Sequence, residues 1–352
     1  MTRITTVGLD IAKSIFQVHA IDSDGKVVIA KAIKRAQVIV LFGKIEPCLI
    51  GIEACGSAHY WGRELTKLGH TVRLMPPKYV KAYVKRGKTD AGDAEAICEA
   101  VTRPTMTFVP VKSASQQALA MLHGVRETLI GQRTQAINAL RGHLSELGVI
   151  APQGLMGLAQ LAAIVRDEED TRLPEIARGT LKILVAQIET TSQAISKTDA
   201  ALKAEHKASA ESRALETVPS IGPIIASALR ARIGDAKVFE NGRHMAAWMG
   251  LVPEQDSSGG KVKQRGISKK GDRYLRRLLV SGAMALVQHA QRKPDKYPWI
   301  AALLARMHPK AAAVAIANKT ARIAWAIMAR GGTYDAGFHA ARTSHAALAA
   351  PA

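Results

Sequence analysis

Cysteine and aromatic residues are scarce in this chain of 352 residues. The three cysteines, Cys48, Cys55 and Cys98, form no CxxC pair, so we expect neither a disulfide framework nor a structural zinc site. Aromatic residues make up only 4% of the sequence, which argues against rows of stacked rings as the main way of holding nucleic acid. We therefore expect reduced, mostly buried thiols in a cytoplasmic protein.

Long apolar runs are also lacking. Residues 1–16 contain no run of signal-peptide length and are interrupted by Asp10. The longest apolar stretch, residues 311–328, is broken by Asn318, Lys319 and Arg322. We expect it to form a helix of a water-soluble domain rather than a membrane span.

Acidic residues are few, with 29 Asp and Glu against 49 Lys and Arg, which gives a net charge of +20. Such an excess is typical of a protein with a polyanionic partner, and nucleic acid is the first candidate. The basic residues that we expect to contact it gather in two segments. They are Lys78, Lys85, Arg86 and Lys88 in the first segment, and Lys261, Lys263, Arg265, Lys269, Lys270, Arg273, Arg276 and Arg277 in the second.

The hydrophobic content of 47% is enough to form cores, and the length predicts two or three domains. Short β-rich runs occupy residues 4–9, 16–21, 26–32, 48–52 and 70–75, and helices are expected at 57–68 and 91–102. Three antiparallel strands followed by alternating helices and strands predict an α/β domain of ribonuclease-H type over residues 1–110.

Helical periodicity takes over after residue 113. Apolar residues recur at spacings of three and four in two runs, from Leu122 to Leu147 and from Leu181 to Leu202. We expect a long coiled-coil hairpin over residues 111–212, packed within one chain or forming a dimer interface. A mostly helical domain is expected over residues 213–332, and a flexible tail over 333–352.

Four acidic residues are candidates for a metal site. Asp10 and Glu53 each end a predicted strand, and Asp90 and Asp93 share one face at the start of a predicted helix. If the four converge at one edge of the sheet they need cations, and oxygen-only ligands select Mg²⁺ or Mn²⁺, which support phosphoryl transfer. Taken singly, Asp90 is equally suited to be a helix N-cap and Asp93 a first-turn partner of the helix dipole.

A second candidate site lies in the glycine-rich segment 255–260. Ser257 and Ser258 directly precede Gly259, which allows a substrate to approach closely, and the second basic segment follows. Cations beside a serine are suited to stabilise a pentavalent phosphate. On spacing alone, a flexible linker beside a solvated basic face is the simpler interpretation.

The segment from Val218 to Pro223 is similar to a helix-hairpin-helix motif. In such a motif, backbone N–H groups, here near Gly222, bind phosphate without reading the base sequence. The usual pattern has glycine where this chain has Ser220. The hairpin is therefore better supported than its phosphate binding.

Together these motifs resemble one family. The strings GLDIAK, GIEACGS, KTDAGDAEAI and WMGLVPEQDSSGGKVKQRGISKKGDRYLRRLL are similar to insertion-sequence transposases of the IS110 family, and ISKKGDRYLRRLL to its IS1111 group. The resemblance extends from residue 4 to residue 330, nearly the whole chain.

The resemblance implies a RuvC-like domain whose DEDD tetrad falls on Asp10, Glu53, Asp90 and Asp93, and a C-terminal domain whose nucleophile is Ser258, or alternatively Ser257. It also implies a Mg²⁺- or Mn²⁺-dependent recombinase that joins element and target double-stranded DNA through a phosphoserine. The implied partners are a guide non-coding RNA and further copies of the chain, in the bacterial nucleoid. A RuvC-like nuclease using metal-activated water and a non-enzymatic nucleic-acid scaffold stay as alternatives.

Overall fold

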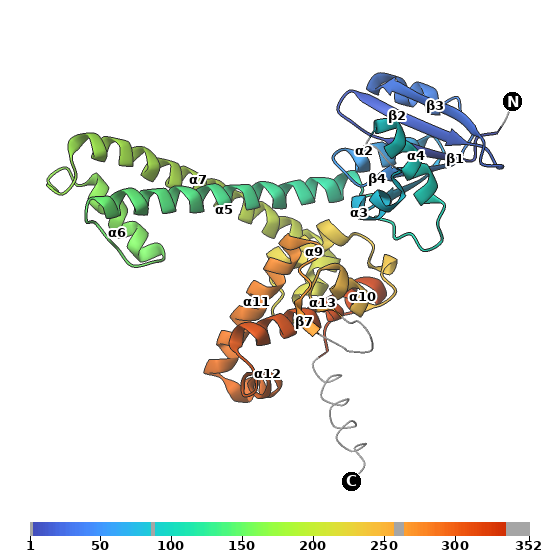
Figure 1. Cartoon of the computed structure of the whole chain (residues 1–352). Helices are drawn as coiled ribbons and strands as arrows, with labels where there is room; N and C mark the ends of the chain where they lie inside the picture. The colour runs from blue at the N-terminus through green and yellow to red at the C-terminus, as the bar shows by residue number, and fades with distance from the viewer. Residues whose placement is uncertain (1–2, 86–88, 257–263, 336–352) are drawn as a thin grey trace, which may run out of the picture. The chain divides into compact units, whose positions relative to one another are not determined.

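The computed structural model describes residues 3–85, 89–256 and 264–335. The chain forms two compact units, Met1–Gln117 and Ala118–Ala352. The first is mixed α/β and the second mostly helical, which confirms the predicted fold class at this level (Figure 1). Every helix among the described residues falls short of the length and apolarity needed to cross a bilayer.

A five-stranded sheet organises the first unit, in the order β3-β2-β1-β4-β5. The pairs β1–β2 and β2–β3 are antiparallel, whereas β1–β4 and β4–β5 are parallel. Asp22 closes the turn between β2 and β3, where its carboxylate accepts from the N–H groups of Asp24 and Lys26. The strands are β1 (Thr6–Asp10), β2 (Ile15–Ile21), β3 (Val27–Lys34), β4 (Leu49–Glu53) and β5 (Thr71–Met75).

Helices cover both faces of this sheet. Alternate strand residues point to opposite sides, and each side packs against a helix. Val7 and Leu9 pack with Trp61 and Leu65 of α2 in one buried cluster. The other face lies against α4. The helical segments of this unit are η1 (Arg35–Gln37), α1 (Val38–Phe42), α2 (Ala58–Lys67), α3 (Pro77–Val80), η2 (Lys81–Tyr83) and α4 (Asp90–Val101).

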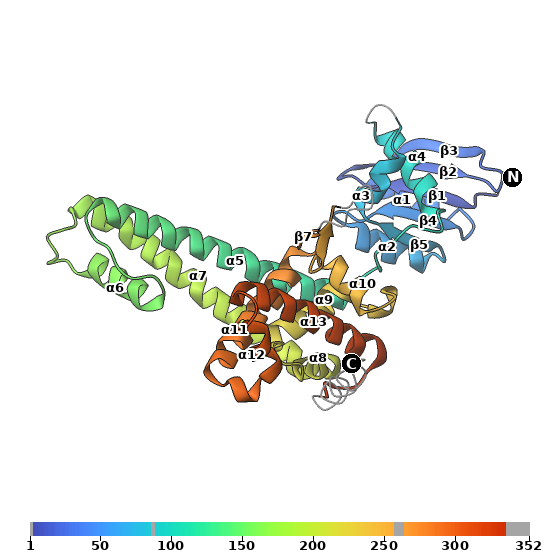
Figure 2. The same ribbon diagram turned by 60° about the horizontal axis from the view of Figure 1, so that its bottom comes forward.

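Two long helices, α5 (Ala114–Glu146) and α7 (Glu175–Ala208), lie side by side over much of their length (Figures 1 and 2). Between them in sequence lies α6 (Leu155–Arg166), which the glycine and proline residues of this stretch did not predict. Leu140 of α5, Leu161 of α6 and Leu181 of α7 share one buried cluster.

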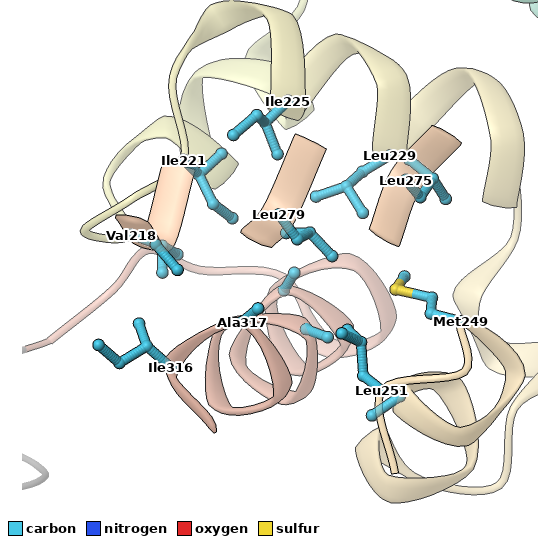
Figure 3. Close-up of a cluster of buried hydrophobic side chains, with 14 of the residues drawn as sticks. Val218, Ile221, Ile225, Leu229, Met249, Leu251, Leu275, Leu279, Ile316 and Ala317 are labelled. Atoms are coloured by element: carbon cyan, nitrogen blue, oxygen red, sulfur yellow. The ribbon is translucent and has the colours of Figure 1, made fainter. Parts of the chain in front are cut away.

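The remaining helices of the second unit enclose its largest core. Figure 3 shows side chains from α9, α11 and α13 meeting in this cluster, joined by Met249 and Leu251. A short antiparallel pair of strands follows these two residues. The elements are α8 (Ala210–Glu216), α9 (Pro223–Ile233), η3 (Ala236–Val238), α10 (Gly242–Trp248), β6 (Pro253–Gln255), β7 (Gln264–Ile267), α11 (Arg273–Arg292), η4 (Pro294–Lys296), α12 (Pro298–Leu304) and α13 (Pro309–Arg330).

Candidate active site

Two glycines allow α4 to lie directly on the sheet. A Cβ atom added to Gly8 of β1 would lie 2.1 Å from the carbonyl oxygen of Ala94, and one added to Gly51 of β4 would lie 2.8 Å from Cβ of Val101. Real side chains do not fit at such distances, so only glycine permits this approach of helix to strand. The start of α4 thereby lies close to the carboxyl end of β1, whereas β4 packs against the end of the helix.

The acids that end these two strands point toward α4. Asp10 follows Gly8 by two residues and Glu53 follows Gly51 by two, and residues two apart in a strand share a face. Their neighbours Leu9 and Ile52 are register partners in the parallel pair β1–β4. Asp10 and Glu53 therefore stand at the carboxyl ends of adjacent parallel strands.

Helix α4 supplies two further acids in its first turn. Thr89 is the N-cap, because its side chain accepts a hydrogen bond from the N–H of Gly92 at 3.1 Å. The alternative of Asp90 as N-cap is therefore wrong, and its carboxylate is left for another role. Asp90 and Asp93, three residues apart, lie on one face of the helix.

Three of the four predicted acids come together. Carboxylate oxygens of Asp10, Asp90 and Asp93 lie within 4.8 Å of one another. Glu53 is not part of this closest group, but its negative charge acts on Asp10. Burial raises the pKa of Asp10 to about 6, with further contributions from the charges of Asp93, Asp90 and Glu53.

This donor set fits a divalent cation. Its atoms are carboxylate oxygens only, which are the ligands that hard divalent cations prefer. The repulsion among these carboxylates, which adds to the effect of burial in raising the pKa of Asp10, is offset when a cation binds. A metal ion held here would contact Asp10 of β1 and both acids of α4.

Sequence reasoning missed a thiol beside these acids. Cys55 is exposed, unlike the buried Cys48 and Cys98. Burial of part of the thiol and the charges of Glu53 and Asp10 raise its pKa. Its position two residues after Glu53 was the signal that could have placed it near the acids.

The predicted basic residues of the first unit are partly described. Lys78 is exposed, with its ammonium 4.5 Å from the ring centroid of Tyr79. Lys85 forms an ion pair with Glu95 at 2.6 Å. Arg86 and Lys88 lie outside the described residues.

The predicted serines, Ser257 and Ser258, and the basic Lys261 and Lys263 also lie outside the described residues. The two strands that flank them are paired antiparallel, with Pro253 opposite Ile267 and Gln255 opposite Gln264. Asp256 and Arg265 add an ion pair of 2.6 Å across the hairpin. The two ends of the serine segment are therefore held together, an arrangement that the sequence pattern did not predict.

The other predicted cations differ in their surroundings. Lys269 and Arg273 are exposed. Lys270 pairs with Glu254 at 2.6 Å, and Arg277 with Glu127 at 3.0 Å. Arg276 donates from its guanidinium to the carbonyl oxygen of Met249 at 2.8 Å, which gives this residue a packing role.

The predicted hairpin before α9 contains Ser220 with a φ of 80°, the left-handed conformation that glycine adopts most easily. Its hydroxyl is hydrogen-bonded to that of Thr320 at 3.0 Å. Gly222 is the N-cap residue of α9, whose first turn contains no acidic side chain. Ser220 therefore adopts a backbone conformation that glycine would adopt at lower cost.

Comparison with known proteins places these features in a family. The chain matches the family model of the IS110 transposase DEDD domain over residues 7–149. It also matches the model described as transposase IS116/IS110/IS902 family over residues 212–298.

Relatives match along almost their full length. A probable family 20 transposase of Pseudomonas aeruginosa is 46% identical over 95% of this chain and 99% of its own length. The transposase for insertion sequence element IS1111A of Coxiella burnetii is 37% identical over 96% of this chain and 93% of its own. The transposase for insertion sequence element IS1328 of Yersinia enterocolitica is 36% identical over 95% and 100%, respectively.

Proposed function

This chain belongs to the IS116/IS110/IS902 family of transposases, which cleave and join DNA, and we propose that it moves an insertion sequence by RNA-guided, serine-dependent recombination. The observation that carries the metal-dependent part of the proposal is that carboxylate oxygens of Asp10, Asp90 and Asp93 lie within 4.8 Å of one another. The order of the sheet, with two parallel strands added to three antiparallel ones, supports a RuvC-like domain of ribonuclease-H type.

We propose that Asp10, Asp90 and Asp93 hold Mg²⁺ or Mn²⁺, with Glu53 completing the tetrad. A bound divalent ion supplies positive charge that activates an attacking oxygen and stabilises a leaving oxygen in phosphoryl transfer. The chain's own contribution is to aim these carboxylates at one point. The close packing of α4 on Gly8 and Gly51 fixes this aim.

Ser258 is proposed as the nucleophile, with Ser257 as the alternative. In the first step, Oγ forms a bond to the scissile phosphorus while the bond from phosphorus to the leaving strand breaks, and the serine proton ends on the displaced strand's hydroxyl. In the second step, a hydroxyl of the other DNA attacks the phosphoserine and returns the proton to Oγ. Because the ester keeps the bond energy, joining needs no nucleotide hydrolysis.

The second unit is proposed to hold the nucleic acid. Residues 111–212 are assigned to a coiled-coil hairpin on the side-by-side course of α5 and α7, and residues 213–332 to the serine-bearing domain. The turn at Ser220 and Gly222 supports a helix-hairpin-helix that grips a DNA phosphate. Exposed Lys269 and Arg273 beside β7 add backbone contacts.

A structured non-coding RNA is proposed to supply sequence recognition to a homo-oligomer of this chain. The net charge of +20 supports a polyanion partner, and guide pairing lets such a protein find a site without reading bases itself. Sequencing the RNA that copurifies should yield one transcript able to pair with both element end and target. Site-specific joining that survives ribonuclease treatment of the purified protein would show the guide role to be wrong.

The chemistry is tested with four single variants in a strand-joining assay with Mg²⁺. Ser258→Ala should lose the covalent protein–DNA adduct on a denaturing gel, whereas Ser257→Ala should keep it. Asp93→Asn should lose both adduct and joining, whereas Asp24→Asn, in the β2–β3 turn, should behave as wild type.

Each rival predicts a different result. If Ser258→Ala and Ser257→Ala both join DNA normally, the serine mechanism is wrong. Cleavage by the wild type without any adduct would favour a nuclease that uses water. DNA binding that is unchanged by a chelator and never followed by cleavage would favour a scaffold.

A further inference from the structure

A cavity of about 1660 Å³ lies in the second unit, lined by α10, α12, α13 and residues 331–335. It is larger than the roughly 300–1,000 Å³ of ordinary small-molecule sites, so it has room for a chain segment. Its lining includes one acidic residue, Asp335, and five basic ones: Arg243, Lys296, Lys319, Arg322 and Arg330. The cavity is therefore suited to an anionic polymer.

Aromatic rings stand beside these cations. Trp299 at the start of α12 is 41% exposed, and the ammonium of Lys319 lies 3.9 Å from its ring centroid. Trp325 of α13 has Arg330 5.2 Å from its centroid. Two of the chain's four tryptophans thus line one cavity. The cation over each ring is placed to hold a phosphate, and the indole surface beside it is suited to stack the attached base.

The walls are held in place by backbone contacts. A Cβ atom on Gly242 would lie 2.9 Å from the carbonyl oxygen of Arg322, so the start of α10 lies directly against α13. The indole N–H of Trp325 donates to the carbonyl oxygens of Ala236 and Phe239 at 3.1 and 3.2 Å. The Trp325 ring and the wall formed by α10 and α13 are therefore preorganised, which lowers the entropy lost when a ligand binds.

We propose that this cavity binds unpaired nucleotides of a nucleic-acid strand, with a base stacked on Trp299 and phosphates held by Lys319 and Arg322. Burial and the neighbouring Arg322 lower the pKa of Lys319, which means that they disfavour its charged form. A bound phosphate would stabilise that charged form. A duplex does not fit this chemistry, because its bases already stack on one another and present only their edges in the grooves. The low aromatic content of the whole chain marks this cavity as a local exception.

The inference goes beyond the proposed strand chemistry and needs neither the carboxylates nor the serine. RNA and DNA strands share the chemistry that the cavity recognises, so the source of the strand is decided by experiment. Full-length protein is titrated, at a salt concentration that suppresses non-specific binding, with four fluorescent probes of equal length. The probes are a mixed-base RNA, a mixed-base DNA, an abasic DNA strand and a DNA duplex.

The wild type should bind a mixed-base strand more tightly than the abasic one. Trp299→Ala should lower the affinity for the mixed-base strand roughly five- to 150-fold and leave the abasic strand unchanged, whereas Trp299→Phe should retain most of the binding. Arg322→Ala should lower the affinity for the mixed-base strand and for the abasic strand to the same extent. Arg292→Ala, an exposed arginine of α11 outside the cavity, should change either affinity much less.

Whichever mixed-base strand binds more tightly identifies the source. The inference would be overturned if the wild type bound the mixed-base and abasic strands equally, or if Trp299→Ala bound the mixed-base strand as tightly as the wild type does. It would also be overturned if Trp299→Ala lowered the affinity for the duplex as much as the affinity for the mixed-base strand. Trp299→Ala should bind Mn²⁺ as tightly as the wild type does, because the carboxylates belong to the first unit. Loss of the strand chemistry and loss of this binding are therefore distinguished.

Discussion

Gly8 and Gly51 are register partners in the parallel strands β1 and β4, and each precedes a carboxylate by two residues. The same local string, an apolar residue, glycine, an apolar residue and an acid, therefore occurs twice at one sheet edge. The apolar residues fill the core on one face, while the glycines leave room for α4 on the other. Helix packing and carboxylate placement are thus two results of one strand pattern.

Gly8→Ala should separate α4 from β1 and disrupt the carboxylate cluster. The added Cβ would lie 2.1 Å from the carbonyl oxygen of Ala94, which is backbone and unable to rotate away. We expect a loss of about 1–3 kcal/mol in the free energy of unfolding and much weaker Mn²⁺ binding, measured by urea unfolding and calorimetry. Gly56→Ala is the matched control, since nothing lies within 4 Å of its added Cβ. Equal Mn²⁺ affinity in the two variants would contradict this account of the site.

The acids were accessible to sequence reasoning because strand ends and a helix start are local features. Asp10 and Glu53 follow short apolar runs, and Asp90 and Asp93 have helical spacing, so both pairs are visible without long-range information. The exact composition of the closest group was not visible. Glu53 stands outside it, whereas Asp90 belongs to it and leaves the capping of the helix to Thr89.

The raised pKa of Asp10 should make the metal-free protein less stable as pH rises. Its folded-state pKa is about 6 against an ordinary value of 3.8. Between these values the folded state keeps a proton that the unfolded chain releases, so the free energy of unfolding falls across this window. Asp10→Asn removes this effect, and without metal it should be more stable than wild type at pH 7.5 by on the order of 1 kcal/mol, once solvent screening is allowed for.

The measurement is urea unfolding in the presence of a chelator, at pH 3.5 and pH 7.5. The two proteins should be equally stable at the lower pH, where both carry a neutral side chain. At pH 7.5, Mn²⁺ should make the wild type more stable than Asp10→Asn, because only the wild type gains binding energy. Asp24→Asn controls for loss of a surface charge. A wild type that matches Asp10→Asn at pH 7.5 without metal would refute the electrostatic origin of the shift.

Elements that depend on distant contacts were harder to predict. Strands β6 and β7 are only three and four residues long and flank a segment of polar and glycine residues in the sequence, so no periodicity reveals them. Helix α6 follows Pro152 and Gly154, which are break signals in sequence, and is stabilised by packing on α5 and α7. For α6 tertiary packing overrides the local pattern, whereas β6 and β7 are defined by their pairing with each other.

Two neighbouring arginines of α11 should behave differently. Arg273 is exposed, whereas Arg276 donates to the carbonyl oxygen of Met249. Arg273→Ala should weaken duplex binding and reduce the salt dependence of log K by about 0.9, with unchanged stability. Arg276→Ala should instead lower the free energy of unfolding by about 1–3 kcal/mol, because it removes the donor to that carbonyl. Salt-dependent anisotropy and urea unfolding separate the two roles, and identical behaviour of both variants would show the distinction to be wrong.

The backbone crossing, in which Gly271 lies directly against the carbonyl oxygen of Trp248, should be needed to place the serine segment that β6 and β7 flank. Gly271 has a φ of 118°, and a Cβ added there would lie 1.8 Å from the carbonyl oxygen of Trp248. Gly271→Ala therefore combines a strained backbone with a clash, and we expect a loss of at least about 2 kcal/mol in the free energy of unfolding.

Gly266→Ala is the matched control, because this residue of β7 has nothing within 4 Å of its added Cβ. Gly271→Ala should join DNA poorly even at a temperature where circular dichroism shows it folded, and its Mn²⁺ affinity should equal that of the wild type, since the carboxylates belong to the first unit. If Gly271→Ala joins DNA as well as Gly266→Ala does, the crossing serves stability alone. Poor joining together with intact metal binding would locate the loss in the segment that β6 and β7 hold.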